Sequence, residues 1–190
     1  MERIPTKTWI LLSTAFLLAG AVWTYLSRVD PGIVSAGNIP APRQGFQAPD
    51  FSVTDSNGQL VRLSDLRGRP VLLNIWASWC APCRAEMPAM QRLYQDYQQR
   101  GFEILAVNLT TQDTPEKALA FANELGLTFP ILFDSEGEAA RLYQVQSLPS
   151  SFFIDEQGII RDVVIGGPMA EALLRIRAEQ LFSGSEQERP

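Results

Sequence analysis

The sequence predicts a single mixed α/β domain, in which helices flank a central sheet, preceded by a transmembrane helix. Three observations lead to this prediction. Short apolar runs alternate with helical stretches, a hairpin and a final helix follow them, and an uncharged apolar segment lies near the N-terminus. A chain of 190 residues has room for one domain of ordinary size with an appendage.

Three short apolar runs suit strands that are buried on both faces. They cover residues 71–76, 102–109 and 129–133. Helical stretches over about 81–99 and 115–125 lie between them, and Thr114 followed by Pro115 is typical of a helix start. This alternation implies parallel strands joined by right-handed crossovers.

Hairpins are expected on both sides of these strands, since a turn sequence separates two short apolar runs in each case. The first joins 51–53 to 59–63, and the second joins 151–154 to 159–165. A last helix over about 168–182 would turn one apolar face to the core. That face is expected to hold Met169, Leu173, Ile176 and Leu181.

The composition excludes several kinds of site. The net charge is -5 and the basic residues are scattered, so no nucleic-acid partner is expected. Histidine is absent, which excludes Ser-His and Cys-His catalysis and imidazole-ligated metals. The two cysteines are too few for a zinc site or a disulfide framework, so they are expected to act as a pair without a cofactor.

Residues 8–26 form an apolar segment without a charge, which at about 1.5 Å per residue approaches the thickness of a bilayer. Arg3 and Lys7 precede it, so the N-terminus is expected in the cytoplasm. We expect a single-pass anchor in the cell membrane with the domain on the extracytoplasmic side. A cleaved signal peptide, which the small residues 19–21 would suit, and a buried helix are the alternatives.

The segment after the apolar stretch is rich in proline and glycine, which indicates an extended tether. The expected organisation has five parts. They are a cytoplasmic N-terminus (1–7), an anchor (8–27), a linker (28–47), the α/β domain (48–183) and a polar tail (184–190).

The sequence Trp79-Cys80-Ala81-Pro82-Cys83 stands where a buried strand ends and a helix begins. Reactive groups favour this edge of an α/β sheet. At a helix N-terminus the backbone N–H groups and the helix dipole stabilise a thiolate, so the pKa of Cys80 should fall. Cys83 lies one turn along, near enough to form a disulfide with Cys80. The pair therefore suits thiol–disulfide exchange, with Cys80 as the exposed nucleophile and Cys83 as the resolving thiol.

Glu86 is a further candidate for the catalytic site. It lies three residues after Cys83, so helical spacing returns it towards the cysteines. A carboxylate there could raise the thiol pKa values or transfer a proton in the resolving step. A solvated helix residue without such a role is the alternative.

This motif, with Pro88 five residues beyond the second cysteine, resembles the thioredoxin superfamily over about residues 48–182, and the spacing of Glu86 resembles its TlpA/ResA-like membrane-anchored branch. The resemblance implies a thioredoxin-like fold and supports the roles of the two cysteines. It also implies a cis-proline opposite the disulfide, which Pro149 matches.

The sequence departs from the family pattern at two positions. Ser147 stands where relatives often have glycine, and Asn74 stands where thioredoxins proper have a buried acid, which makes Glu86 the better candidate for proton transfer. The residues expected to contact substrate are Trp79, Ala81, Pro82, Leu148 and Pro149.

The resemblance further implies a reductant of exported proteins, including apocytochrome c before haem attachment, that a membrane electron-transfer partner re-reduces. A disulfide donor and a copper(I) carrier are the alternatives. Two weaker alternatives are a buried pair of reduced cysteines without a redox role and a scaffold protein in which the pair is incidental. A peroxiredoxin-type peroxidase is disfavoured, because Ala77 stands where that class has threonine or serine.

Overall fold

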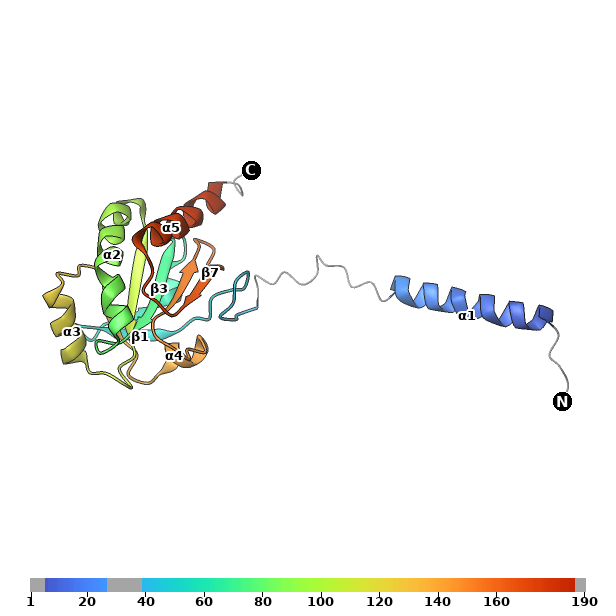
Figure 1. The fold of residues 1–190 in the computed structure, drawn as a ribbon, viewed down its shortest axis with the longest axis horizontal. Coiled ribbons are helices and arrows are strands. Elements are labelled where there is room, and N and C mark those ends of the chain that lie inside the picture. Colours follow the sequence, from blue (N-terminus) through green and yellow to red (C-terminus); the bar gives the residue numbers. More distant parts are fainter. Residues whose placement is uncertain (1–5, 27–38, 187–190) are drawn as a thin grey trace. The chain divides into compact units, whose positions relative to one another are not determined.

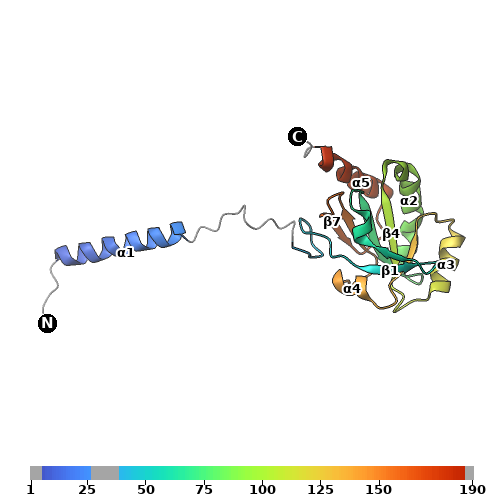
Figure 2. The same cartoon turned by 180° about the vertical axis from the view of Figure 1, so that it is seen from behind.

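The computed structural model describes residues 6–26 and 39–186, which belong to two separate units (Figure 1). One unit contains helix α1 (Thr6–Leu26), and the other is an α/β domain that both views show as a sheet covered by helices (Figure 2). Parts of the predicted N-terminus, linker and tail lie outside the described residues.

Helix α1 is 21 residues long and carries several large apolar side chains that are more than half exposed. They are Leu12, Phe16, Leu17, Leu18, Val22 and Trp23. Within residues 6–26 and 39–186, no helix is long and apolar enough to cross a membrane. The transmembrane helix predicted over 8–27 is therefore not shown by the structure.

The domain contains one seven-stranded sheet in the order β2-β1-β5-β4-β3-β6-β7. The strands are β1 (Ser52–Asp55), β2 (Leu60–Arg62), β3 (Val71–Trp76), β4 (Glu103–Asn108), β5 (Ile131–Phe133), β6 (Ser150–Ile154) and β7 (Ile160–Ile165). Strands β3, β4 and β5 are parallel, and the other neighbours pair antiparallel. The predicted mixed sheet, its parallel centre and both hairpins are confirmed.

Side chains on the two faces of the sheet form two apolar cores, because successive residues of a strand point to opposite faces. Helices α2 (Ala81–Tyr97), α3 (Pro115–Glu124) and α5 (Glu171–Glu186) contribute to the first core, and α4 (Glu138–Leu142) contributes to the second. In β3, Leu72 and Trp76 face the first core, whereas Leu73 and Ile75 face the second. Two 3-10 turns, η2 (Leu63–Leu66) and η3 (Gln98–Arg100), complete the domain.

Helix α5 differs from its prediction in both limits and orientation. It begins at residue 171 and continues to 186, into the predicted tail. Leu174, Ala178 and Leu181 are its buried residues, whereas Leu173 and Ile176 are exposed. The predicted face is confirmed for Met169 and Leu181, which are buried, and wrong for Leu173 and Ile176. Apolar residues occur on more than one side of this helix, and packing against α2 and β6 selects among them.

The backbone hydrogen bonds of the domain begin within the predicted linker. Gly45 N–H donates to the Ile160 carbonyl (2.8 Å), and Ile160 N–H donates to the Phe46 carbonyl (2.9 Å). Ala48 N–H donates to the Gly158 carbonyl (2.9 Å). The chain entering the domain is therefore tied to the turn of the β6–β7 hairpin and to the first residue of β7.

Candidate active site

The cysteine pair lies at the junction between the central strand β3 and helix α2. Residues 77–79 make a turn after β3, and Cys80 is the N-cap residue of α2, with its Sγ accepting a hydrogen bond from Cys83 N–H (3.3 Å). Pro82 occupies the first helical turn, where its missing N–H leaves no hydrogen bond unmade. The predicted position of Cys80 at a helix N-terminus is confirmed.

Cys80 and Cys83 form a disulfide, with 5.3 Å between their Cα atoms. Cys83 is fully buried, and Cys80 is only 4% exposed. The expectation of an exposed nucleophile is therefore wrong for this oxidised form, because both cysteines pack into the first apolar core. The lowered pKa predicted for the Cys80 thiol stays a prediction.

Strand pairing places Pro149 beside the end of β3, where the cysteine turn begins. Strand β6 runs antiparallel to β3 with Ser150 opposite Ile75, so the residues before β6 lie beside the end of β3. The Leu148–Pro149 bond is cis, as the resemblance implies, and Gly166 N–H donates to the Pro149 carbonyl (2.8 Å). At Ser147, where relatives often have glycine, the carbonyl accepts a hydrogen bond from the Ser150 hydroxyl (2.7 Å).

A groove of about 310 Å³ opens beside Cys80 and is lined only by uncharged residues. Four of the predicted substrate-contacting residues line it, namely Trp79, Ala81, Pro82 and Leu148. Pro149 is not among the lining residues. The remaining lining residues, which sequence reasoning missed, are Leu109, Gln112, Val145, Gln146 and Ser147. They come from loops whose place beside α2 depends on strand order.

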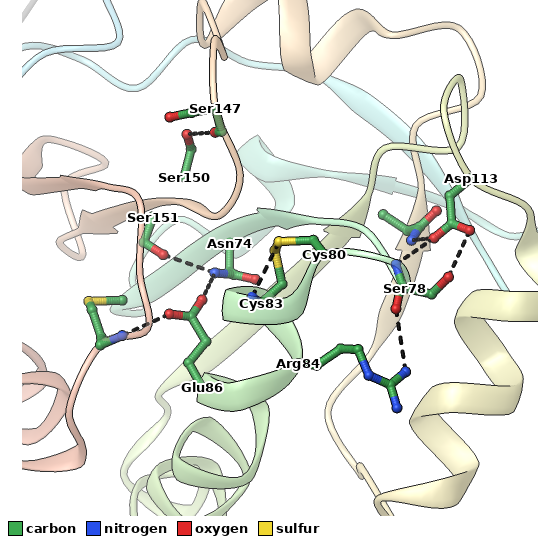
Figure 3. Close-up of a disulfide and its surroundings, with 12 residues drawn as sticks. Asn74, Ser78, Cys80, Cys83, Arg84, Glu86, Asp113, Ser147, Ser150 and Ser151 are labelled. Carbon is green, nitrogen blue, oxygen red and sulfur yellow. Dashed lines mark hydrogen bonds between the residues drawn. A yellow bond between two sulfur atoms is a disulfide. The ribbon is translucent and has the colours of Figure 1, made fainter.

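Glu86, in the second turn of α2, is fully buried rather than solvated. Its Oε1 accepts a hydrogen bond from the Asn74 side-chain amide (2.9 Å), and its Oε2 accepts one from Met169 N–H (3.0 Å). The same Asn74 amide group donates to Ser151 Oγ (2.9 Å). In Figure 3 the Asn74 side chain lies between the Glu86 carboxylate and the disulfide.

Burial raises the pKa of Glu86 above its ordinary value, although the hydrogen bonds from Met169 N–H and the Asn74 amide act in the opposite direction. A carboxyl group with a raised pKa exchanges protons at a higher pH than a solvated one. Such a group is suited to proton transfer with a thiol.

Gly167 makes a close approach to both Pro149 and Glu86. A Cβ atom added to Gly167 would lie 2.8 Å from Pro149 Cγ and 2.9 Å from Glu86 Oε2. The absence of a side chain therefore lets the segment after β7 cover Glu86, which in turn places Met169 N–H on the carboxylate. No pattern in the sequence marks this contact.

Within residues 6–26 and 39–186, no group of three or more His, Cys, Asp or Glu side chains is placed to hold a metal ion. The Asn74 side-chain amide instead links Glu86 and Ser151 by hydrogen bonds.

Comparison with known proteins agrees with this arrangement. Residues 45–163 match the AhpC/TSA family, more than half of the chain. The chain belongs to this thioredoxin-like family. It is 43% identical over 175 residues to the thiol-disulfide oxidoreductase ResA of Geobacillus kaustophilus. The matched residues make up 92% of this chain and 94% of that relative. It is also 46% identical over 125 residues to the thioredoxin-like protein YneN of Bacillus subtilis, or 65% of this chain and 72% of that protein.

Solved structures show the same similarity. The putative thiol:disulfide interchange protein DsbE of Chlorobium tepidum has a TM-score of 0.65 at 35% identity, covering 71% of this chain and 94% of that chain. StoA of Bacillus subtilis has a TM-score of 0.59 at 30% identity, covering 68% of this chain and 96% of that chain. The protein has a thioredoxin-like fold and is a thiol-disulfide oxidoreductase.

Replacing Glu86 by Gln should change how stability depends on pH. A raised pKa in the folded state means that Glu86 stabilises the fold fully below about pH 4 and that this contribution is lost as pH rises through the folded pKa. Relative to Glu86→Gln, the wild type should therefore lose unfolding free energy as pH rises from about 4. Urea unfolding of the disulfide-bonded proteins across this range measures the difference. The exposed Glu136→Gln is the control, and equal pH dependence in all three proteins would contradict the prediction.

Replacing Gly167 by Ala should destabilise the domain, because the added methyl group meets a proline ring and a carboxylate that is fixed by hydrogen bonds. We expect a loss of about 1–3 kcal/mol, which is typical of overpacking. Urea unfolding measures this loss. Gly20→Ala is the matched control, since nothing lies within 4 Å of its added Cβ. A Gly167→Ala protein as stable as the wild type would show that the segment moves away freely.

Proposed function

We propose that the protein reduces disulfides of exported proteins, with Cys80 as the attacking thiolate and Cys83 as the resolving thiol. One observation carries this proposal: Cys80 borders the uncharged groove, whereas Cys83 does not and is fully buried. A target disulfide that enters the groove meets Cys80 first. The N-terminus of α2 favours the negative charge that the attacking sulfur carries.

The reaction proceeds in two exchanges and starts from the reduced pair. The Cys80 thiolate attacks one sulfur of the target disulfide, whose S–S bond breaks, and the other target sulfur leaves as a thiolate and is protonated. Cys83 then loses its proton and attacks the Cys80 sulfur, which releases the second target sulfur as a thiolate that is protonated in turn. The target gains two electrons and two protons, and the protein is left with the disulfide seen in the structure.

In this mechanism Glu86 accepts the proton of Cys83 in the second exchange. Its place one helical turn beyond Cys83 supports the role, as do its burial and raised pKa. Asn74 fixes one carboxylate oxygen by its 2.9 Å hydrogen bond. The Asn74 side-chain amide does not gain or lose a proton near neutral pH. The carboxyl group is therefore the titratable member of this buried contact.

The proposed substrates are exported proteins with disulfides on extended, accessible segments, because the groove offers apolar and uncharged polar contacts to a peptide. Apocytochrome c before haem attachment is the candidate within this class, and only the sequence resemblance supports it. A reductant outside the cytoplasm works in an oxidising compartment. We therefore include a membrane electron-transfer partner that returns two electrons to the Cys80–Cys83 pair.

We further propose that the N-terminal segment holds the chain at the cell membrane, with the domain on the extracytoplasmic side. The exposed apolar side chains of α1 support this, since soluble proteins rarely leave such a surface uncovered. Arg3 and Lys7 support the cytoplasmic placement of the N-terminus.

The direction of the reaction is tested by the reduction potential of the pair. A reductant should have a value near that of thioredoxin, about -270 mV, whereas a value near -120 mV would identify a disulfide donor.

In cells, Cys83→Ser should accumulate mixed disulfides with exported proteins, because the resolving thiol is missing. Cys80→Ser is the matched control and should trap none. Equal trapping by both variants would overturn the assigned roles.

Membrane attachment is tested in the full chain by replacing both Leu17 and Leu18 with Asp. Each acidic residue costs about 3 kcal/mol at the centre of a membrane-inserted helix, so the variant should leave the membrane fraction. Leu173→Asp with Ile176→Asp, two exposed apolar positions of α5, is the control and should not change fractionation. A Leu17/Leu18 variant that stays membrane-bound would contradict the proposal.

A further inference from the structure

The turn that carries Cys80 rests on the loop that follows the neighbouring strand β4. Strands β3 and β4 are parallel and in register at their carboxyl ends, where Trp76 lies opposite Asn108. Leu109 N–H continues this contact by donating to the Trp76 carbonyl (2.8 Å). Residues 77–79 and 109–114 therefore leave the sheet side by side.

Every polar group of Ser78, in the middle of the turn, has a partner (Figure 3). Its backbone N–H donates to Asp113 Oδ2 (2.6 Å), and its hydroxyl donates to Asp113 Oδ1 (2.8 Å). Its carbonyl accepts a longer hydrogen bond from Arg84 Nη1 (3.4 Å). A single carboxylate thus holds Ser78 by two hydrogen bonds.

The same carboxylate accepts two more hydrogen bonds, one from the last residue of β4 and one from the residue that follows Asp113. Asn108 Nδ2 donates to Asp113 Oδ2 (2.9 Å), and Thr114 N–H donates to Asp113 Oδ1 (2.9 Å). Partial burial alone would raise the pKa of Asp113, but the hydrogen bonds from Asn108, Ser78 and Thr114 lower the pKa below its ordinary value. Asp113 is therefore ionised at neutral pH, and all four of its partners are donors.

The residue after Ser78 in the turn is bound to the residue before Asp113 in the loop. The Trp79 side chain is 58% exposed, yet its indole N–H donates to the Gln112 carbonyl (2.9 Å). Trp79 and Gln112 both line the groove beside Cys80. Two consecutive residues of the turn are thus bound to two consecutive residues of the loop, immediately before the nucleophile.

We propose that Asp113 is a positioning residue for disulfide exchange, which holds the 77–79 turn so that Cys80 faces a target disulfide in the groove. This inference rests on exchange at Cys80 as proposed above. Attack on a disulfide depends on the placement of the attacking sulfur, and small misplacements of a reacting group lower rates strongly. A role confined to the start of α3, where Thr114 is the N-cap, would leave the turn and its chemistry unchanged.

Asp113→Asn in the full chain tests the proposal. Asparagine keeps the shape but replaces one acceptor oxygen by an amide donor, so at least one of the four donors around it loses its partner. The probe is a synthetic peptide disulfide, reduced in a single turnover by the reduced protein. At saturating peptide we expect a rate constant on the order of tenfold lower, because the turn is less well held. The half-saturating peptide concentration should change less than about twofold, since Asp113 does not line the groove.

Thr110→Val is the matched control. The Thr110 hydroxyl belongs to the same loop but donates only to Asn108 and does not reach the turn. This variant should exchange at the wild-type rate. An Asp113→Asn protein with the wild-type rate constant would overturn the inference, and so would an equal loss in Thr110→Val.

Ser78→Ala keeps the proposal testable if Asp113→Asn does not fold. It removes the hydroxyl bond alone and should lower the saturating rate about threefold. A folded Ser78→Ala protein with the wild-type rate would then overturn the inference. Failure of the proposed function is distinguishable, because in that case the wild type itself would not reduce the peptide disulfide through Cys80.

Discussion

The structure depends above all on the placement of the central strand β3. This strand is buried on both faces, pairs in parallel with β4 and pairs antiparallel with β6. Its carboxyl end therefore meets the end of β4 and the start of β6 at one edge of the sheet. The cysteine turn, the 109–114 loop and Pro149 converge there because backbone pairing brings their strands together.

Beneath this edge, a carboxyl group is held inside the first apolar core. Burying Glu86 is unfavourable for its ionised form, and the surrounding donors compensate only partly, so its pKa is raised. The Asn74 amide and Met169 N–H come from β3 and from the segment after β7, which lie far apart in the sequence. The environment of this buried carboxyl group thus depends on the completed tertiary structure.

Much of the domain was predictable because local patterns and tertiary contacts agree. The parallel strands, both hairpins and the helix that begins after Cys80 follow from apolar runs, turn residues and capping signals. Helix α4 was missed because it has only five residues, too few for a periodic pattern. Its start depends on Asp134, whose carboxylate accepts hydrogen bonds from Ala139 N–H and Ala140 N–H. Leu173 and Ile176 of α5 were wrongly assigned to the core because they are as apolar as the residues that pack.

The sequence by itself determined the redox pair, its place at a helix N-terminus and the candidacy of Glu86, because these depend on residues within two helical turns of one another. Only the tertiary structure decided that Cys80 is covered in the disulfide form, that Gly167 closes over Glu86 and that Asp113 holds Ser78. These contacts join residues 35 to 81 positions apart, and no local spacing encodes them. Strand order and register bring such residues together.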